Sequence, residues 1–156
     1  MENTARPIVF EPKGFNALSL SELYRILALR SEIFVVEQDC VYQDIDFKDQ
    51  KALHIIGTID SKIIAYSRIF KAGDYAQYES IGRVVVDSAY RKFGFGHQLL
   101  QYSIRVLLEK FDSQYIELSG QTYLLDFYRS HQFEPVGSEY LEDGIPHIRM
   151  LFRTKR

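Results

Sequence analysis

The chain has 156 residues, of which 46% are hydrophobic and 26% are charged, as expected for one globular domain. The formal net charge of −2 excludes the strong basic field typical of proteins that bind nucleic acid. The single cysteine, Cys40, excludes an internal disulfide framework, so we expect a reducing, cytoplasmic compartment. No apolar run approaches the roughly 18 residues of a membrane span, and the N-terminus lacks the pattern of a signal peptide, so we expect no membrane partner.

The first half of the chain predicts a strand, a helix and then three strands. Residues 8–15 suit a strand, and Ser19 and Glu22 form a capping box, in which each side chain satisfies a backbone amide of the other. The helix that starts there is expected to end near Gln38, where its helical apolar spacing stops. A polar, acidic loop follows over residues 39–51. β-rich runs then predict strands at residues 53–59, 63–70 and 78–86.

The second half begins with an apolar stripe between Leu99 and Phe111 that predicts a long helix. Asp143 and Gly144 give a strong turn signal near the C-terminus. The remaining elements are a strand at residues 115–118, a helix at 122–129 and strands at 133–141 and 147–152. The order β-α-β-β-β-α-β-α-β-β mixes antiparallel hairpins with crossover helices. It indicates a single domain, residues 1–156, of the α/β (α+β) class, with a mixed, mostly antiparallel sheet flanked by helices.

The most informative segment is the end of the strand at residues 78–86 and the turn after it. Two basic residues and two glycines follow in the pattern R-x-x-G-x-G at residues 91–96, just before the long helix. Free amides at a helix start bind anions, and glycine lets the backbone come close to a phosphate. A nucleotide P-loop is excluded because Gly-Lys-Ser and Gly-Lys-Thr are absent, and a dinucleotide fingerprint because Leu99 replaces its third glycine. The turn therefore predicts a pyrophosphate site, and the alternative is a glycine-rich turn without a ligand.

This turn resembles the coenzyme A loop of the GCN5-related N-acetyltransferases (GNAT), in which its backbone amides bind the CoA pyrophosphate. The predicted strand order extends the resemblance over about residues 8–152, and four further blocks narrow it to the ElaA-like branch. They are FVVEQ at residues 34–38, YQDID at 42–46, IGRV at 81–84 and EDGIPH at 142–147. Gln132 departs from the family, which often has a glycine in a left-handed conformation there, so we expect the end of the preceding helix to differ locally.

The resemblance implies direct attack of an amine on the thioester of acetyl-CoA in a ternary complex, with no metal. Backbone groups of a splayed strand would hold the pantetheine arm, and an amide of that strand would polarise the carbonyl. The residues implied for donor binding are Val84, Val85, Val86, Arg91, Lys92, Phe93, Gly94, Phe95, Gly96, His97 and Gln121. For Gln121, a first-turn helix residue or cap is an equal alternative. The alternative function is a module that binds CoA or another phosphate ligand without turnover.

Tyr128 resembles the general acid of the family. A phenol has a reference pKa of about 10, so it keeps its proton at neutral pH and can give it to a departing thiolate. The alternative is that Tyr128 is one more aromatic residue on an amphipathic helix. The general base stays open, and the candidates are Glu37, Glu79, Glu117, Asp44 and His147.

Glu37 and Arg83 have two interpretations. Arg83 lies inside an apolar strand, where a buried cation needs an acidic partner, so the two residues could form a structural ion pair. Otherwise Glu37 acts as a catalyst, while Arg83 and His147 bind the acceptor. Four aspartates in the loop over residues 39–50 favour a cationic acceptor, either a small molecule or a peptide amine. Exposed strand edges make a homodimer possible.

The remaining polar residues predict no metal site. Asp44, Asp46 and Asp49 are spaced like the start of a calcium loop, but Asp49 replaces its glycine and Ile55 its last carboxylate. The four histidines have no ligand spacing. Cys40 could be a nucleophile in a ping-pong route, but a lone loop cysteine is more often incidental.

Overall fold

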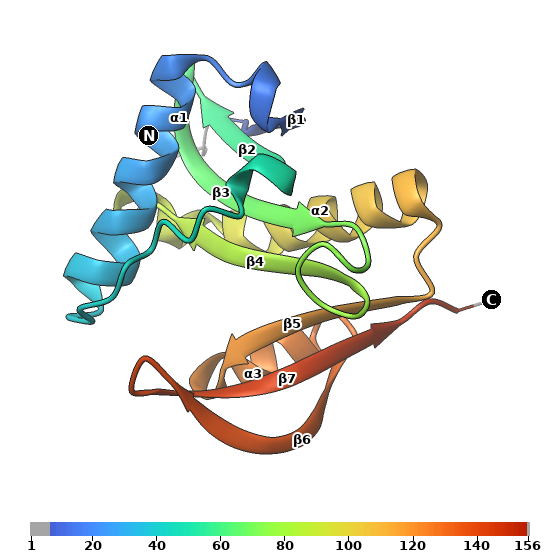
Figure 1. Cartoon of the computed structure of the whole chain (residues 1–156). Coiled ribbons are helices and arrows are strands. Elements are labelled where there is room, and N and C mark those ends of the chain that lie inside the picture. The colour runs from blue at the N-terminus through green and yellow to red at the C-terminus, as the bar shows by residue number, and fades with distance from the viewer. Residues whose placement is uncertain (1–6, 156) are drawn as a thin grey trace, which may run out of the picture.

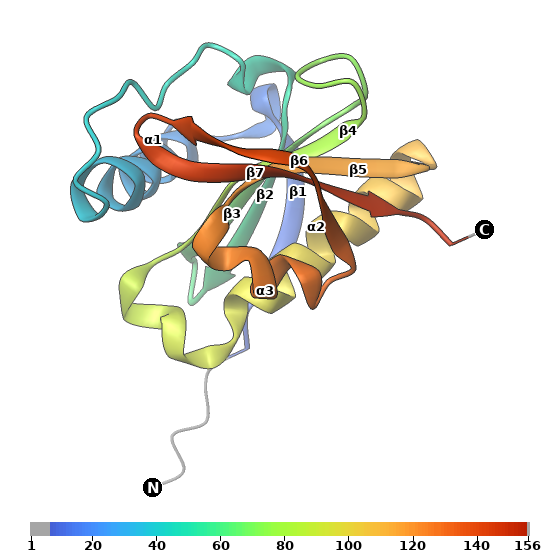
Figure 2. The same ribbon diagram turned by 90° about the horizontal axis from the view of Figure 1, so that it is seen from below.

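The protein forms one seven-stranded sheet with helices on both faces (Figures 1 and 2). The structure is a computed structural model that describes residues 7–155. The strands are β1 (Val9–Gly14), β2 (Leu53–Ile59), β3 (Lys62–Phe70), β4 (Glu79–Val86), β5 (Tyr115–Gln121), β6 (Phe133–Glu142) and β7 (Ile145–Arg153). They lie in the order β1-β2-β3-β4-β5-β7-β6, and only β4 and β5 run parallel. The predicted mixed, mostly antiparallel sheet is confirmed.

The helices are α1 (Leu20–Arg30), α2 (Phe95–Phe111) and α3 (Leu125–Arg129). Shorter turns are η1 (Phe15–Ala17), η2 (Ser31–Glu37), η3 (Asp49–Lys51), η4 (Ser88–Phe93) and η5 (Thr122–Leu124). The predicted capping box is confirmed, because Ser19 Oγ accepts from the Glu22 amide at 3.0 Å and Glu22 Oε1 from the Ser19 amide at 2.9 Å. The helix predicted to end near Gln38 is an α-helix that continues as the π-helical segment η2. None of the described helices is long and apolar enough to cross a membrane.

Each face of the sheet carries its own apolar core. Because successive side chains of a strand point to opposite faces, Ile55 of β2 belongs to the core under α2 and Ile56 to the core under α1. Leu99 and Leu107 anchor α2, and Ile26 is among the residues that anchor α1; all are fully buried. The central strands are therefore buried on both sides, which explains their nearly continuous apolar sequence.

The sheet is nearly divided between β4 and β5. These strands pair only at Glu79 with Ile116 and at Ser80 with Glu117, and then part toward the left in Figure 1. A bulge at Arg83, whose φ is 52°, bends β4 where its register with β3 shifts. Beyond the divergence, β5 pairs only with β7. The predicted splay is confirmed, and it leaves the β5-facing edge of β4 without a strand partner in the described chain.

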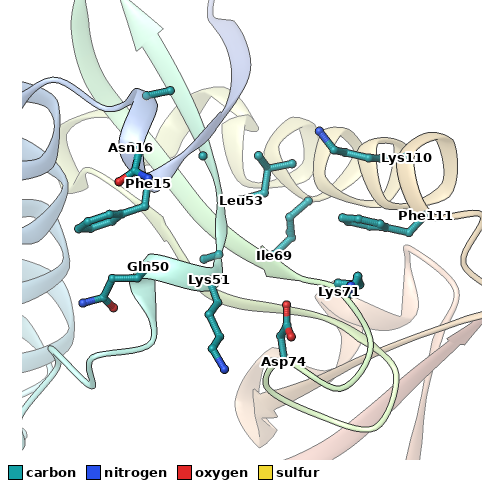
Figure 3. A pocket seen from close by; sticks show the side chains of 13 residues that line it. Phe15, Asn16, Gln50, Lys51, Leu53, Ile69, Lys71, Asp74, Lys110 and Phe111 are labelled. Atoms are coloured by element: carbon teal, nitrogen blue, oxygen red, sulfur yellow. The ribbon is translucent and has the colours of Figure 1, made fainter.

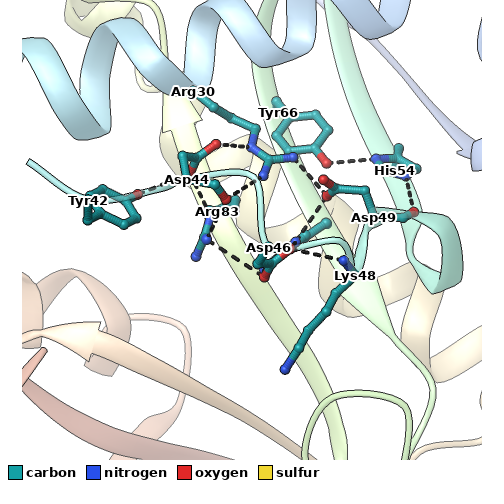
Figure 4. Close-up of polar contacts among 10 residues, drawn as sticks. Arg30, Tyr42, Asp44, Asp46, Lys48, Asp49, His54, Tyr66 and Arg83 are labelled. Atoms are coloured by element: carbon teal, nitrogen blue, oxygen red, sulfur yellow. Dashed lines mark hydrogen bonds and ion pairs between the residues drawn. The ribbon is translucent and has the colours of Figure 1, made fainter. Parts of the chain in front are cut away.

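A buried network of arginines and aspartates fixes the loop between η2 and β2 to the sheet (Figure 4). Arg30 is fully buried, and its guanidinium lies 2.8 Å from both Asp44 Oδ2 and Asp49 Oδ1. Arg68, 1% exposed, pairs with Asp46 at 2.5 Å and Asp49 at 3.0 Å. The spacing that resembles a calcium loop thus serves ion pairs with arginine. The loop's acidic charge is largely neutralised, so it no longer favours a cationic acceptor.

The network also lowers the pKa values of Asp46 and Asp49. Burial raises the pKa of Asp49, but hydrogen bonds and charge from Arg30 and Arg68 outweigh it. The pKa of Asp46 likewise lies well below its usual range, since Arg68 outweighs burial there. These carboxylates stabilise the fold above their unfolded pKa of about 4 and lose that contribution as the pH falls through their native pKa values.

We therefore expect Asp49→Asn to lower the free energy of unfolding at pH 7 by about 3–5 kcal/mol, because two buried arginines lose a shared counter-charge. Asp39→Asn is the matched control, since it neutralises an exposed aspartate of the same loop. Urea denaturation from pH 7 to pH 3 measures both, and the gap between wild type and Asp49→Asn should narrow progressively as the pH falls below about 4, toward the lowered native pKa of Asp49. Equal losses for the two variants would contradict this account.

Candidate functional site

The glycine loop forms an uncapped helix start. Asp87 ends β4 and accepts the Ala89 amide at 3.0 Å, which starts η4. Gly94 then takes the left-handed conformation, φ 72°, as the N-cap of α2, and no side chain caps the helix. The first amide of α2 that bonds back is that of Gln98, which reaches the Gly94 carbonyl at 3.3 Å. Among the described residues, the amides of residues 95–97 therefore have no backbone hydrogen-bond acceptor, which is the free helix start that the sequence predicts.

Gly96 has no side chain to cover the surface beside these amides. A Cβ at this position would lie 3.8 Å from the Phe127 ring and 4.0 Å from a Val86 methyl group, which is ordinary contact. An alanine therefore fits at this position. Gly94 differs, because a Cβ there meets nothing within 4 Å and glycine is favoured for its backbone conformation.

Tyr128 lies on α3 and is 6% exposed. Its ring covers Gly120 of β5, where a Cβ would come within 3.0 Å of Tyr128 Cε2. Burial raises the pKa of Tyr128 to about 12. The hydroxyl makes no hydrogen bond with the described part of the chain, so it is available to a bound molecule. The expectation that Gln132 changes the helix end is wrong for the backbone, since Gln132 itself is left-handed, with φ 71°.

The comparisons with known proteins agree with this geometry. Residues 26–153 match the family model of the acetyltransferase (GNAT) domain. The chain belongs to the GNAT family. It is 42% identical to protein ElaA of Escherichia coli over 135 residues, which is 85% of this chain and 88% of that protein. The family transfers acyl groups from acyl-CoA.

Two solved structures have closely similar folds. An acyl-CoA N-acyltransferase from Pseudomonas aeruginosa matches with a TM-score of 0.88 and 37% identity, over 94% of this chain and 99% of that one. The crystal structure of Escherichia coli ElaA also has a TM-score of 0.88, with 38% identity over 94% of this chain and 100% of the other. The ElaA-like resemblance of the sequence is thereby confirmed.

Some side chains of the glycine loop have partners within the protein that the sequence does not predict. Arg91 forms a two-pronged ion pair with Glu37 at the end of η2, with Nη2 2.7 Å from Oε2. The hydrogen bonds from Arg91 lower the pKa of the Glu37 carboxyl. Lys92 and Phe93 are exposed, and His97 Nδ1 lies 2.8 Å from His131 Nε2. The expected ion pair between Glu37 and Arg83 is wrong, because each residue has another partner.

Arg83 binds the network instead. Its Nε lies 2.8 Å from Asp44 Oδ1, and its Nη2 donates to the Asp44 carbonyl at 3.0 Å. Because Asp44 also binds Arg30, its carboxylate is occupied. Glu117 is occupied as well, since it accepts from the Tyr78 amide at 2.9 Å and from Arg149 at 3.1 Å.

Other candidate site residues lie near the open end of the divergence, where β4 and β5 are no longer paired. Gln121 ends β5, where it pairs with His147 of β7, and it is also the N-cap residue of η5, although its side chain makes no capping hydrogen bond. Its amide donates to Gln38 Oε1 at 3.2 Å. His147 is buried, with Nδ1 2.7 Å from the Ile145 carbonyl and Nε2 3.1 Å from Glu142. Glu79 lies at the closed end, where β4 and β5 still pair.

The valines of β4 lie on both faces at this open end. Val85 is buried in the core under α1, whereas Val84 and Val86 are half-buried against the core under α2. Their backbone groups toward β5 have no strand partner in the described chain. An extended ligand can therefore add to this edge as a short strand would.

A separate hollow of about 530 Å³ lies at the other end of α2 (Figure 3). Phe15, Leu53, Ile69 and Phe111 contribute to its lining, together with Lys51. Since α2 has 17 residues and is about 25 Å long, this hollow is remote from the glycine loop. It is not part of the site built by β4, β5 and the start of α2.

Sequence reasoning missed Gly120, although an isolated glycine inside a strand often marks the close approach of another group. We expect Gly120→Ala to lower the free energy of unfolding by about 1–3 kcal/mol, because the new methyl group meets the Tyr128 ring. Gly14→Ala is the control, since a Cβ at Gly14 meets nothing within 4 Å. Thermal unfolding compares the two variants, and an unchanged midpoint for Gly120→Ala would refute the packing argument.

Proposed function

We propose that this protein transfers an acetyl group from acetyl-CoA to an amine, which attacks the thioester directly in a ternary complex. The observation that carries the proposal is the hydroxyl of the buried Tyr128, which has no hydrogen-bond partner in the described chain and lies on the helix beside the uncapped start of α2. The hydroxyl of Tyr128 suits a departing thiolate, and the uncapped start of α2 suits a pyrophosphate. Family membership supplies the reaction class.

Donor binding is proposed to use the backbone. The free amides of residues 95–97 hold the pyrophosphate, with Lys92 adding positive charge. The unpaired edge of β4 at residues 84–86 holds the pantetheine arm. One of its amides polarises the thioester carbonyl, and an oxyanion donor of this kind contributes about 3–4 kcal/mol to transition-state stabilisation.

Tyr128 is proposed to donate its hydroxyl proton to the sulfur as the C–S bond breaks. Its pKa of about 12 keeps it protonated over the whole neutral and mildly alkaline range. His147 is proposed to bind the acceptor, since it is buried at the open end of the divergence beside Gln121. Arg83, with a side chain 20% exposed, is proposed to line the acceptor side.

Calorimetric titration with acetyl-CoA, followed by assays of thiol release with a panel of amines, tests the proposal. Binding followed by amine-dependent release of thiol is the expected result. Binding without release for any amine would favour a CoA-binding module instead. Absence of binding would overturn both functions.

We expect Gly96→Glu to abolish CoA binding, because its side chain adds bulk and negative charge where the pyrophosphate lies. Gly96→Ala should bind CoA nearly as well as wild type, since a Cβ fits there at ordinary contact distances. Calorimetry gives both affinities, and circular dichroism checks the folds. A folded Gly96→Glu variant with normal CoA affinity would show that the loop assignment is wrong.

We expect Tyr128→Phe to lower kcat roughly 10²-fold or more, at the lower end of typical general-acid effects, with little change in CoA affinity. Tyr123→Phe is the matched control, since Tyr123 lies on the preceding turn and is 74% exposed. In the wild type, loss of the Tyr128 proton should not reduce the rate below about pH 10, because its pKa is about 12. Unchanged turnover and pH profile in Tyr128→Phe would exclude Tyr128 as the acid.

A further inference from the structure

The ion pair between Glu37 and Arg91 connects the end of η2 to the turn η4. Arg91 belongs to the turn η4, just before the free amides of α2. Glu37 is the last residue of η2 and lies 54 residues earlier in the sequence. Both guanidinium Nη groups contact the carboxylate. The side chains are 44% and 40% exposed, so a ligand can reach them from solvent.

The carboxylate occupies the face of Arg91 that a phosphate group would use. An arginine fork binds carboxylate and phosphate in the same two-pronged way. While both Nη groups face Glu37, they are not available to a pyrophosphate on residues 95–97. The negative charge of Glu37 near that place also opposes an incoming phosphate. Both effects lower the affinity for CoA.

The segment that carries Glu37 does not depend on this ion pair for its position. The next residue, Gln38, binds Gln121 at 3.2 Å. Cys40 Sγ donates to the Asp143 carbonyl at 3.3 Å, and Ile33 is buried in the core under α1. Exposed ion pairs contribute little to stability, so Arg91 can change partners without loss of the fold.

We propose that Glu37 is a built-in competitor of CoA for Arg91. It holds the guanidinium while the donor site is empty and releases it to the pyrophosphate when CoA binds. Glu37 thereby sets the affinity for the donor, rather than acting as the general base. The proposal rests on the proposed function, because it takes the glycine loop as the pyrophosphate site.

Calorimetry with CoA at low ionic strength tests the competition in five proteins: the wild type, Glu37→Gln, Glu32→Gln, Arg91→Gln and the Glu37→Gln/Arg91→Gln double variant. We expect Glu37→Gln to bind CoA roughly 2- to 5-fold more tightly, since an exposed ion pair changes an equilibrium constant by no more than about 5-fold. Glu32→Gln is the matched control, because it removes the same charge from an exposed position of η2, and its affinity should equal that of the wild type. Arg91→Gln should bind more weakly, and adding Glu37→Gln to it should tighten binding by clearly less than it does in the wild type, because only the through-space repulsion is then relieved.

The double variant separates competition from simple repulsion. If Glu37→Gln tightens binding equally in the Arg91→Gln background, the carboxylate acts through space and the competition is refuted. Unchanged or weaker binding by Glu37→Gln would also overturn it and would mean that Glu37 orients Arg91 for the ligand. A wild type that fails to bind CoA removes the proposed function itself, which is a distinct result.

Discussion

The divergence of β4 from β5 is the constraint on which the rest of the molecule depends. A parallel pair that stays closed would use the amides and carbonyls of residues 81–86 for the sheet. Here the two strands share only two register positions. The sheet therefore consists of a part with β1 to β4 and a part with β5, β7 and β6. The first part supplies the open strand edge, and the second supplies Gly120 and leads into the helix of Tyr128.

Ion pairs stabilise the bend in β4 that opens this divergence. Arg83 adopts a left-handed conformation, φ 52°, which costs a non-glycine residue of order 1–3 kcal/mol. Its guanidinium binds Asp44, which also binds the fully buried Arg30. The strained residue is thus held by the same network that fixes the loop after η2. Because that loop begins at the turn carrying Glu37 and Gln38, the buried charges indirectly position groups at the proposed donor site.

The sequence predicted the features that depend on neighbours along the chain. The order of elements, the capping box and the turn at Asp143 and Gly144 are local, and both turn residues have positive φ values, 50° and 79°. The pattern at residues 91–96 predicted the free helix start for the same reason.

Charge partners were not predictable in this way. Glu37 and Arg91 are 54 residues apart, and which of several arginines meets Glu37 depends on how η2 and η4 lie in space. The roles of Asp44, Asp46 and Asp49 were missed because arginines from α1, β3 and β4 converge on them. The sequence predicted β5 to end near Leu118, because nothing local indicates that pairing with β7 continues to Gln121.

The raised pKa of Tyr128 constrains how it can act. A phenol with a pKa of about 12 is a weaker acid than a thiol with a reference pKa of about 8.5, so complete proton transfer to a free thiolate is uphill by about 5 kcal/mol. In the proposed reaction, Tyr128 would therefore stabilise the sulfur first by donating a hydrogen bond as negative charge develops. The proton that finally leaves with the thiol would then come from the attacking amine. The proposal thus requires the amine to lose its proton close by, with the acceptor pocket within a short proton relay of Tyr128.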